Sequence, residues 1–456
     1  MTENRHITPA APGATEITPA IASQSGSGYP PSTDEMTNPK RELAAMPGEK
    51  PIQPARWRNC FYRFINAVYF HRVTLVHPQR LPKVGPVLYL GLHRNGAVDG
   101  FVYQRVLNGP VFMISTQLRK SRFARVFFDG IAVTRTKDEG DRNQNDAAMR
   151  QCLGHLRSGG QLFVFPEGTS SLGPRHLPFK SGAIWLLLDY LASGGPPLQV
   201  VPVGIHYERP WAFRSKVEVV LGEPISTSLP QNAGRLERLK ILKQRLRIAL
   251  ENVGINVPTE AYQEQIQRFA CIATLGTSRS YFKSLKGMER GVPGQITEQW
   301  EKLEPDLRRA KLWFHQDVPL FPTRPMMVYL LLLLIISPFV FAAILINLPA
   351  LAAGWVAGEK FPDDRNVISL WRILVGVPVF VLWMTALTVT LLLLGKIGWL
   401  MALGVATWLG MKLYYRFKKL AVIVHNGIRH PVLRLNMLRF HQTVVQSLPD
   451  ETNHPN

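Results

Sequence analysis

The sequence predicts an α/β fold: a mostly parallel sheet flanked by helices, with an added helical region and a C-terminal transmembrane helical hairpin. Short apolar runs alternate with helical stretches between residues 82 and 226, which is the pattern of a parallel sheet built from βα units. Two long uncharged runs follow, Met326 to Gly358 and Ile373 to Gly395. A bilayer crossing needs about 20 apolar residues, so either run suffices, whereas buried core helices usually have shorter apolar runs. A chain of 456 residues has room for more than one domain.

The N-terminal 80 residues divide into a tail and a helix. Residues 1-50 are rich in Pro, Ser, Thr, Ala and Gly and poor in large apolar residues, so we expect a disordered tail. In residues 51-80, Trp57, Phe61 and Phe64 recur at helical spacing among several arginines. We expect an amphipathic helix at a membrane interface, although a helix packed on the protein core would carry the same pattern.

The next two regions are the α/β domain, residues 81-230, and a helical extension, residues 231-320. In the α/β domain, Gly and Pro mark the ends of most elements. The expected strands cover 86–92, 110–115, 131–134, 161–166, 198–207 and 216–222, and the expected helices cover 98–107, 122–129, 146–159 and 181–193. In the extension, the charged stretch 234–254 is the clearest helix.

The C-terminal part is expected to hold a transmembrane hairpin, residues 321-411, and a basic cytoplasmic tail, residues 412-456. Basic residues flank the apolar region on both outer sides, so the positive-inside rule places both ends in the cytoplasm and requires an even number of crossings. We expect two spans, joined by residues 359–372. The apolar stretch 397–411 is short for an independent span and reads as a continuation or an interfacial helix. A re-entrant anchor that does not cross the bilayer is the alternative.

Net charge and cysteine content narrow the class of partner. The chain carries 53 Lys and Arg against 32 acidic residues, a net charge of +21, which favours an anionic partner such as a membrane or nucleic acid. Zinc-ligand spacing, a recognition helix and paired aromatic strand motifs are all missing, so we expect no nucleic acid. Cys60, Cys152 and Cys271 are too scattered for a metal cluster or a disulfide framework and fit a reducing compartment.

A candidate acid–base pair follows the first expected strand of the α/β domain. His93 and Asp99 stand at the transition from strand to helix, where α/β proteins commonly bind ligands. If the loop folds back through Gly96, the carboxylate accepts a hydrogen bond from one imidazole nitrogen and leaves the other as a base. Because no Gly-x-Ser-x-Gly elbow accompanies the pair, the attacking hydroxyl is expected to belong to a substrate.

Three further polar motifs supply groups for an anionic acceptor and a developing oxyanion. Arg135 and Lys180 offer positive charge for a phosphate, and the turn around Glu167 brings hydroxyls and backbone amides to a strand end. Taken singly, each of these residues is explained as well by a solvated charge or a plain turn. Their order and joint presence are the stronger signal.

The four motifs are, in order, residues 91–100, 129–138, 163–183 and 200–207. Together they resemble the motifs of the phospholipid and glycerol acyltransferase superfamily over roughly residues 80-225. The stretch "FPEGTSS", residues 165–171, is the most specific. The resemblance implies the glycerolipid acyltransferase fold, with His93 as general base and Asp99 as its orienting partner. It further implies that Pro202 shapes the acyl-chain site. The expected substrate-binding residues are Arg135, Glu167, Gly168, Thr169, Ser170, Lys180 and Pro202.

The spacing within the first motif points to a branch of that superfamily. Most members carry four residues between the His and the Asp, and this chain carries five. In this respect the chain resembles the fungal-type glycerol-3-phosphate and dihydroxyacetone-phosphate acyltransferases, which also have the longer spacing between the His and the Asp.

The resemblance implies a membrane-bound O-acyltransferase of phospholipid biosynthesis that uses no cofactor. It would move a fatty acyl group from acyl-CoA or acyl-ACP to a hydroxyl of glycerol 3-phosphate or of a 1-acylglycerol 3-phosphate, a lysophospholipid. Two alternatives stay open: an acyltransferase acting on a lyso-aminolipid, and an inactive membrane protein that binds anionic lipid.

Overall fold

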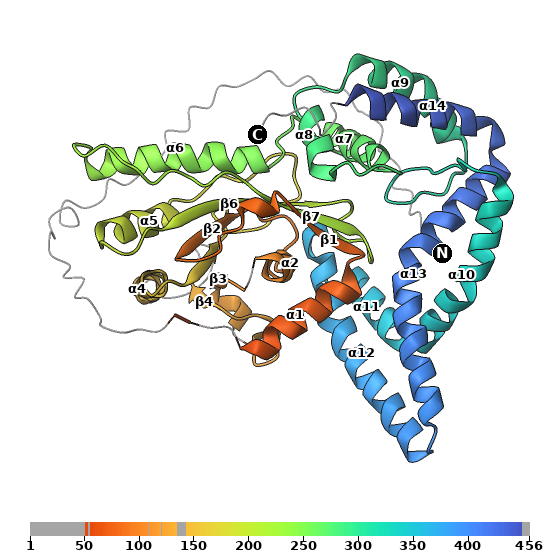
Figure 1. The fold of residues 1–456 in the computed structure, drawn as a ribbon, viewed down its shortest axis with the longest axis horizontal. Helices are drawn as coiled ribbons and strands as arrows, with labels where there is room; N and C mark the ends of the chain where they lie inside the picture. Colours follow the sequence, from red (N-terminus) through yellow and green to blue (C-terminus); the bar gives the residue numbers. More distant parts are fainter. Residues whose placement is uncertain (1–50, 53–54, 108, 120, 135–142, 449–456) are drawn as a thin grey trace, which may run out of the picture. The chain divides into compact units, whose positions relative to one another are not determined.

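The computed structural model describes residues 51–52, 55–107, 109–119, 121–134 and 143–448. Its centre is a seven-stranded sheet in the order β1-β7-β6-β2-β5-β3-β4 (Figure 1). Neighbouring strands pair in parallel except β6 and β7, which are antiparallel, so the predicted mostly parallel sheet is confirmed. The strands are β1 (Arg72–Val76), β2 (Val87–Gly91), β3 (Val111–Ser115), β4 (Ile131–Val133), β5 (Gln161–Val164), β6 (Gln199–Tyr207) and β7 (Lys216–Leu221).

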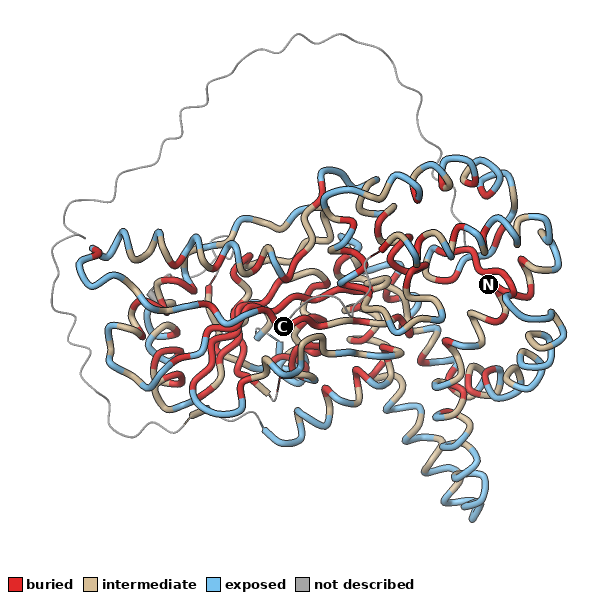
Figure 2. Tube along the Cα trace, turned by 45° about the horizontal axis from the view of Figure 1, so that its top comes forward, coloured by how far each residue is buried: buried red, intermediate tan, exposed pale blue. Residues whose placement is uncertain are grey.

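Helices cover both faces of this sheet. Leu88 and Leu90 of β2 join a core cluster with α4 (Asn143–Arg157), α5 (Gly182–Ala192) and α6 (Arg235–Val253). Val87 and Tyr89, on the opposite face, join a cluster with α1 (Arg56–Tyr69), α2 (Val98–Val106) and α3 (Ala124–Phe127). Successive side chains of a strand point to opposite faces, so a strand covered on both sides is apolar throughout. Figure 2 shows the buried residues concentrated in this sheet.

Region 51-80 contains a strand that the sequence reading missed. The helix α1 ends at Tyr69, and Arg72–Val76 forms the edge strand β1, parallel to β7. Helix α1 buries Tyr62, Ile65 and Tyr69 in the core, while Trp57 is 51% exposed. One face of α1 therefore packs on the core as in the alternative reading.

A third apolar cluster joins the helical extension to the last described helix, α14 (Pro431–Ser447). Phe269 and Trp300 of the extension pack against Phe440 of α14, so these two parts of the chain share one apolar core. The expected boundary at residue 412 falls inside α13, and the described part of 412-456 is helical and packed. The helices concerned are α7 (Glu260–Ala273), α8 (Tyr281–Met288), α9 (Gly294–Arg309), α13 (Ile397–Arg429) and α14 (Pro431–Ser447).

Three helices in the described residues are long and apolar enough to cross a membrane, which adds one to the two expected segments. They are α10 (Met326–Ile346), α12 (Ile368–Leu393, entered through a short 3-10 turn from Arg365) and α13. The first uncharged run is divided at Asn347, and its second part forms the shorter helix α11 (Leu348–Lys360).

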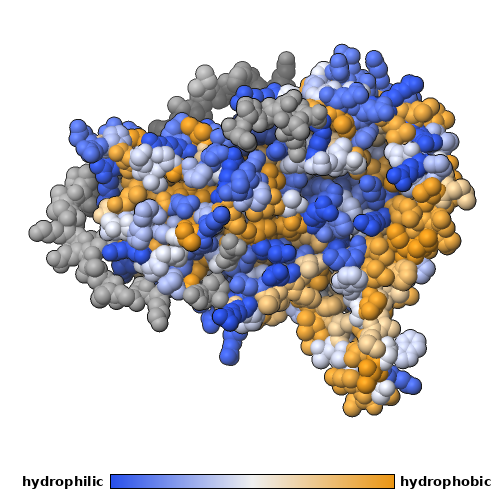
Figure 3. Space-filling view, viewed as in Figure 1, coloured by the Kyte–Doolittle hydropathy of each residue, from blue (hydrophilic) through white to orange (hydrophobic). Residues whose placement is uncertain are grey.

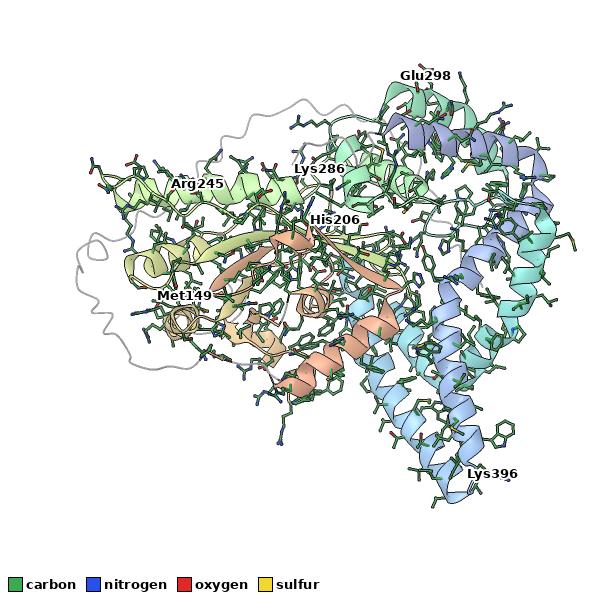
Figure 4. The ribbon with its side chains drawn as sticks, viewed as in Figure 1. Met149, His206, Arg245, Lys286, Glu298 and Lys396 are labelled. Atoms are coloured by element: carbon green, nitrogen blue, oxygen red, sulfur yellow. The ribbon has the colours of Figure 1, made fainter. Side chains whose placement is uncertain are left out.

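The four helices of this region pack as two antiparallel pairs, α10 with α13 and α11 with α12. Asn347 donates to Thr407 Oγ1 at 3.2 Å where α10 meets α13, and Gly354 of α11 meets Gly376 of α12. Figure 3 shows apolar surface along α10 and α13, and Figure 4 shows Lys396 at the free end of the α12–α13 hairpin. The third helix was missed because its apolar half, 397–411, runs without a break into a basic half that contacts the α/β domain.

Three partly or fully buried histidines predict a loss of stability in acid. Burial lowers the pKa of His71 to about 4 and those of His176 and His206 to about 3. They are neutral in the folded chain, whereas the unfolded chain takes up their protons as pH falls below about 6.5. Each histidine should therefore lower the free energy of unfolding by about 1 to 2 kcal/mol when the pH falls from 7.5 to 5.0. Thermal unfolding in detergent at the two pH values measures this loss.

The variant His206→Gln is the control for this pH dependence. The ring Nε2 of His206 lies 2.8 Å from the carbonyl of Val253, and a glutamine amide keeps a donor there without titrating. The variant should lose less stability than the wild type on acidification. An equal loss would show that other groups govern the acid response.

Candidate active site

The side chains of His93 and Asp99 are in contact, as we predicted from the sequence. His93 lies in the loop after β2, and Asp99 lies in the first turn of α2. The loop turns back through Gly96, whose φ of +52° lies in the left-handed region that favours glycine. His93 Nδ1 and Asp99 Oδ2 are 2.9 Å apart, so Nδ1–H donates to the carboxylate and Nε2 is the nitrogen that remains to accept a proton. The His93 side chain is 15% exposed and that of Asp99 is 0% exposed.

The carboxylate of Asp99 is held by donors on both oxygens. Oδ2 also accepts from the backbone N–H groups of Arg94 (2.6 Å) and Asn95 (2.9 Å), and Oδ1 accepts from the hydroxyl of Tyr207 (2.6 Å). Burial and the nearby charge of Asp99 raise the pKa of Tyr207 well above its usual value, so the phenol keeps the proton that it donates. Sequence reasoning missed Tyr207, although it ends the fourth motif, "VVPVGIHY".

Glu167 binds the protein backbone on both sides. Its Oε1 accepts from the N–H of His93 at 2.9 Å, and Oε2 accepts from the N–H of Leu177 at 3.1 Å. The residue is 2% exposed, and burial raises the pKa of its carboxyl although the two amides oppose this. Since each oxygen already has a partner, the geometry favours a role in fixing the His93 loop. The expected contact with a glycerol phosphate stays a prediction.

The rest of the third motif lies beside His93. Gly168, Thr169, Ser170 and Lys180 line the same cavity as His93, and the N–H of Ser171 donates to the carbonyl of His93 at 3.1 Å. Gly168 has a φ of +70°, and a Cβ there would lie 2.9 Å from Lys180 Nζ. Glycine thus permits both the turn and the approach of the ammonium group.

The cavity has a volume of about 820 Å³, which is within the usual range for ligand sites. Much of its wall is apolar and comes from β3, α2 and the segment around α3, and it includes Phe101, Phe112 and Ile131. Among the described residues, Arg58, Arg119 and Lys180 are the lysines and arginines that line it. Within the described ranges no group of His, Cys, Asp or Glu side chains is arranged to hold a metal ion.

Two predicted site residues, Arg135 and Pro202, are not among the described residues that line the cavity. Arg135 lies outside the described residues, although its neighbours Val133 and Thr134 line the cavity. Pro202 is buried in β6 opposite Leu90 of β2 and is not among the described residues of the cavity wall. Its expected role in shaping the acyl-chain site stays a prediction.

Part of the cavity wall comes from the region expected to join two spans. Val367 and Leu370, at the start of α12, line the cavity, and Asn366 contacts Ser170. Neither periodicity nor spacing signalled this, because the contact joins residues 196 positions apart.

Comparison with known proteins points to one family. Residues 72–206 match the family model described as acyltransferase. Over 87 residues the chain is 34% identical to glycerol-3-phosphate O-acyltransferase 2 of Saccharomyces cerevisiae, covering 19% of this chain and 12% of that protein. Over 257 residues it is 23% identical to an uncharacterized acyltransferase of Schizosaccharomyces pombe, covering 48% of this chain and 38% of that protein.

Among solved structures, the chain is similar to the 1-acyl-sn-glycerophosphate (LPA) acyltransferase PlsC of Thermotoga maritima. The match covers 43% of this chain and 78% of that chain, with 19% identity and a TM-score of 0.31.

Proposed function

Residues 72–206 form an acyltransferase domain of the glycerolipid acyltransferase superfamily, and from this premise we propose that the chain transfers a fatty acyl group to a glycerol-phosphate hydroxyl. The donor is the thioester of acyl-CoA or acyl-ACP. The acceptor is glycerol 3-phosphate or a 1-acylglycerol 3-phosphate, and the product enters phospholipid biosynthesis.

The observation that carries this proposal is the His93–Asp99 pair at the wall of a largely apolar cavity. An imidazole whose Nδ1–H is held by a buried carboxylate is a general base at Nε2. The cavity beside it holds apolar side chains for an acyl chain and basic side chains for a phosphate. Acyl transfer to a phosphorylated alcohol needs all three of these features.

The reaction proceeds without a covalent acyl-enzyme. The acceptor hydroxyl oxygen attacks the thioester carbonyl carbon while His93 Nε2 takes the hydroxyl proton. Asp99 stabilises the imidazolium that forms. The tetrahedral intermediate then collapses, the carbon–sulfur bond breaks, and the leaving thiolate takes the proton back from the imidazolium.

Binding of the acceptor is assigned to the basic groups and the third motif. Arg135, Lys180 and Arg119 hold the phosphate, and Thr169 and Ser170 contact phosphate or acyl oxygen. Positioning of the two substrates contributes several kcal/mol to lowering the barrier.

The membrane helices place the enzyme where its lipids are. Acyl chains partition into a bilayer with about 0.8 kcal/mol per buried methylene, so lipid acceptors and products reside there. By the positive-inside rule the α/β domain faces the cytoplasm, and the anchor is a multi-pass segment with an even number of crossings.

A thiol-release assay tests the proposal. Purified protein in detergent is given palmitoyl-CoA with glycerol 3-phosphate, dihydroxyacetone phosphate, 1-acylglycerol 3-phosphate or a lyso-aminolipid. Thiol release is expected with a glycerol-phosphate acceptor. A preference for acceptors without phosphate would contradict the phosphate site, and anionic-lipid binding without thiol release would favour an inactive lipid-binding protein.

The variant Lys180→Met is expected to raise the acceptor KM about tenfold and to leave the KM for palmitoyl-CoA within about twofold. A charge-assisted hydrogen bond to phosphate is worth roughly 1.5 kcal/mol or more, and methionine keeps most of the apolar stem. Steady-state kinetics with each substrate varied in turn measures both constants. Lys240→Met on the exposed face of α6 is the matched control and should match the wild type.

A further inference from the structure

The turn that leads into the membrane helix α12 is bonded to the third motif of the active site. Asn366 is 6% exposed, and its Nδ2 group donates to both the backbone carbonyl and the hydroxyl of Ser170, each at 3.1 Å. A buried amide with two bonds to one residue fixes that residue in place. Ser170 therefore depends on a side chain from outside the α/β domain.

The same turn supports the loop that carries His93. A Cβ at Gly96 would lie 3.1 Å from the carbonyl oxygen of Asn366 and 3.2 Å from Val367 Cγ1, so the loop and the turn are in close contact. This loop contains the additional residue between the histidine and the aspartate. The lengthened loop is thus packed against the membrane segment.

Buried polar contacts extend this junction. The hydroxyl of Ser369 donates to the carbonyl of Pro210 at 2.6 Å, and Asn95 Nδ2 donates to the same carbonyl at 3.1 Å. Asn95 and Ser369 are both 0% exposed.

Apolar contacts continue along the start of α12. Ile373 and Val377 belong to the core cluster of the α/β domain that contains Tyr89 and Phe163. Together with Val367 and Leu370 in the cavity wall, they make the start of α12 part of the α/β core.

We propose that Asn366 is a positioning residue for acyl transfer, through which the membrane anchor holds Ser170 and the His93 loop in their working arrangement. This inference rests on the proposed function. It also places residues 361–367 on the same side of the membrane as the α/β domain. The expected hairpin, in which residues 359–372 join two spans, would put them on the opposite side.

Kinetics of Asn366→Ala and Asn366→Asp test the positioning role, with the acceptor that the wild type uses in the thiol-release assay. Both variants lose the donor to Ser170, so the acceptor KM should rise about tenfold while the KM for palmitoyl-CoA stays within about twofold. In the double variant Ser170→Ala, Asn366→Ala, the effect should equal that of the larger single change, because both act through one contact. Additive effects, or an acceptor KM equal to that of the wild type, would overturn the role.

The matched control is Asn347→Ala. Asn347 is also a buried asparagine of the anchor, and its Nδ2 bonds the carbonyl of Ala343 and the hydroxyl of Thr407, at the turn between α10 and α11. This variant should lose thermal stability but keep both KM values. A rise of the acceptor KM as large as that of Asn366→Ala would mean that any damage to the anchor acts on the site, and would contradict a specific role.

The side of the membrane on which residues 361–367 lie can be tested without an activity assay. In a Cys60→Ser background, Asp363→Cys and Glu298→Cys are labelled with a membrane-impermeant maleimide in sealed vesicles of one orientation. Both positions are exposed, and Glu298 lies on α9 (Figure 4). Equal labelling is expected, and labelling of Asp363→Cys only after permeabilisation would overturn the placement. A wild-type chain that releases no thiol from either acyl-CoA or acyl-ACP would refute the proposed function, and the positioning role of Asn366 with it, while labelling still decides the placement.

Discussion

His93→Ala lowers kcat by about three to four orders of magnitude if His93 Nε2 is the base for the acceptor hydroxyl. General-base catalysis contributes roughly 10²- to 10⁴-fold, and the upper end applies when the base is fixed by a buried partner, as Asp99 fixes His93. Neither substrate is bound through a charge on His93, so the KM values for both substrates should stay within about threefold. Thiol release under saturating substrates measures the loss.

Two companion variants separate loss of the base from loss of shape. His93→Gln keeps a polar side chain against the ring of Phe165, on which His93 stacks at 4.0 Å, but glutamine takes up no proton. It should be as inactive as His93→Ala. In His93→Gly, added imidazole should restore part of the rate, and the restored rate should grow with the imidazole concentration. Turnover within about threefold of the wild type in His93→Ala would exclude this residue as the base.

The acid–base pair could be predicted from sequence because its two residues are close in the chain. His93 and Asp99 are six positions apart, and a strand-to-helix turn brings such residues together. Tyr207 reaches Asp99 from 108 positions away, and Asn366 reaches Ser170 from 196 positions away. Contacts of this kind depend on how elements pack, which local spacing does not encode.

The elements of the sheet show the same limit. Buried strands such as β2 stand out as apolar runs bounded by Gly or Pro, and all six expected strands are present. The edge strand β1 is half exposed and lies directly after α1, so its apolar residues read as a continuation of the helix. The division between α10 and α11 did have a signal, since Pro349 follows Asn347 and Leu348 and proline is common in the first turn of a helix.

Asp99→Asn is expected to lower kcat by about 10³-fold while the fold is retained. Asparagine can place its carbonyl oxygen where Oδ2 accepts from His93, Arg94 and Asn95, and its amide can donate to the Tyr207 oxygen, because a hydroxyl can accept as well as donate. The hydrogen bonds are therefore kept and only the negative charge is lost. A charge pair about 4 Å apart at an effective dielectric constant near 20 is worth about 4 kcal/mol, which corresponds to about 10³ in rate.

Tyr207→Phe distinguishes charge from orientation at Asp99. Phenylalanine removes the donor to Oδ1 and leaves the carboxylate charge and the bonds to Oδ2 in place. Loss of one such bond costs roughly 1 to 2 kcal/mol, so kcat should fall about tenfold, far less than in Asp99→Asn. Thiol release by both variants, with thermal unfolding to confirm that both are folded, gives the comparison. Equal losses would mean that Asp99 acts by holding the imidazole in place, whereas the expected difference assigns the larger share to stabilisation of the imidazolium.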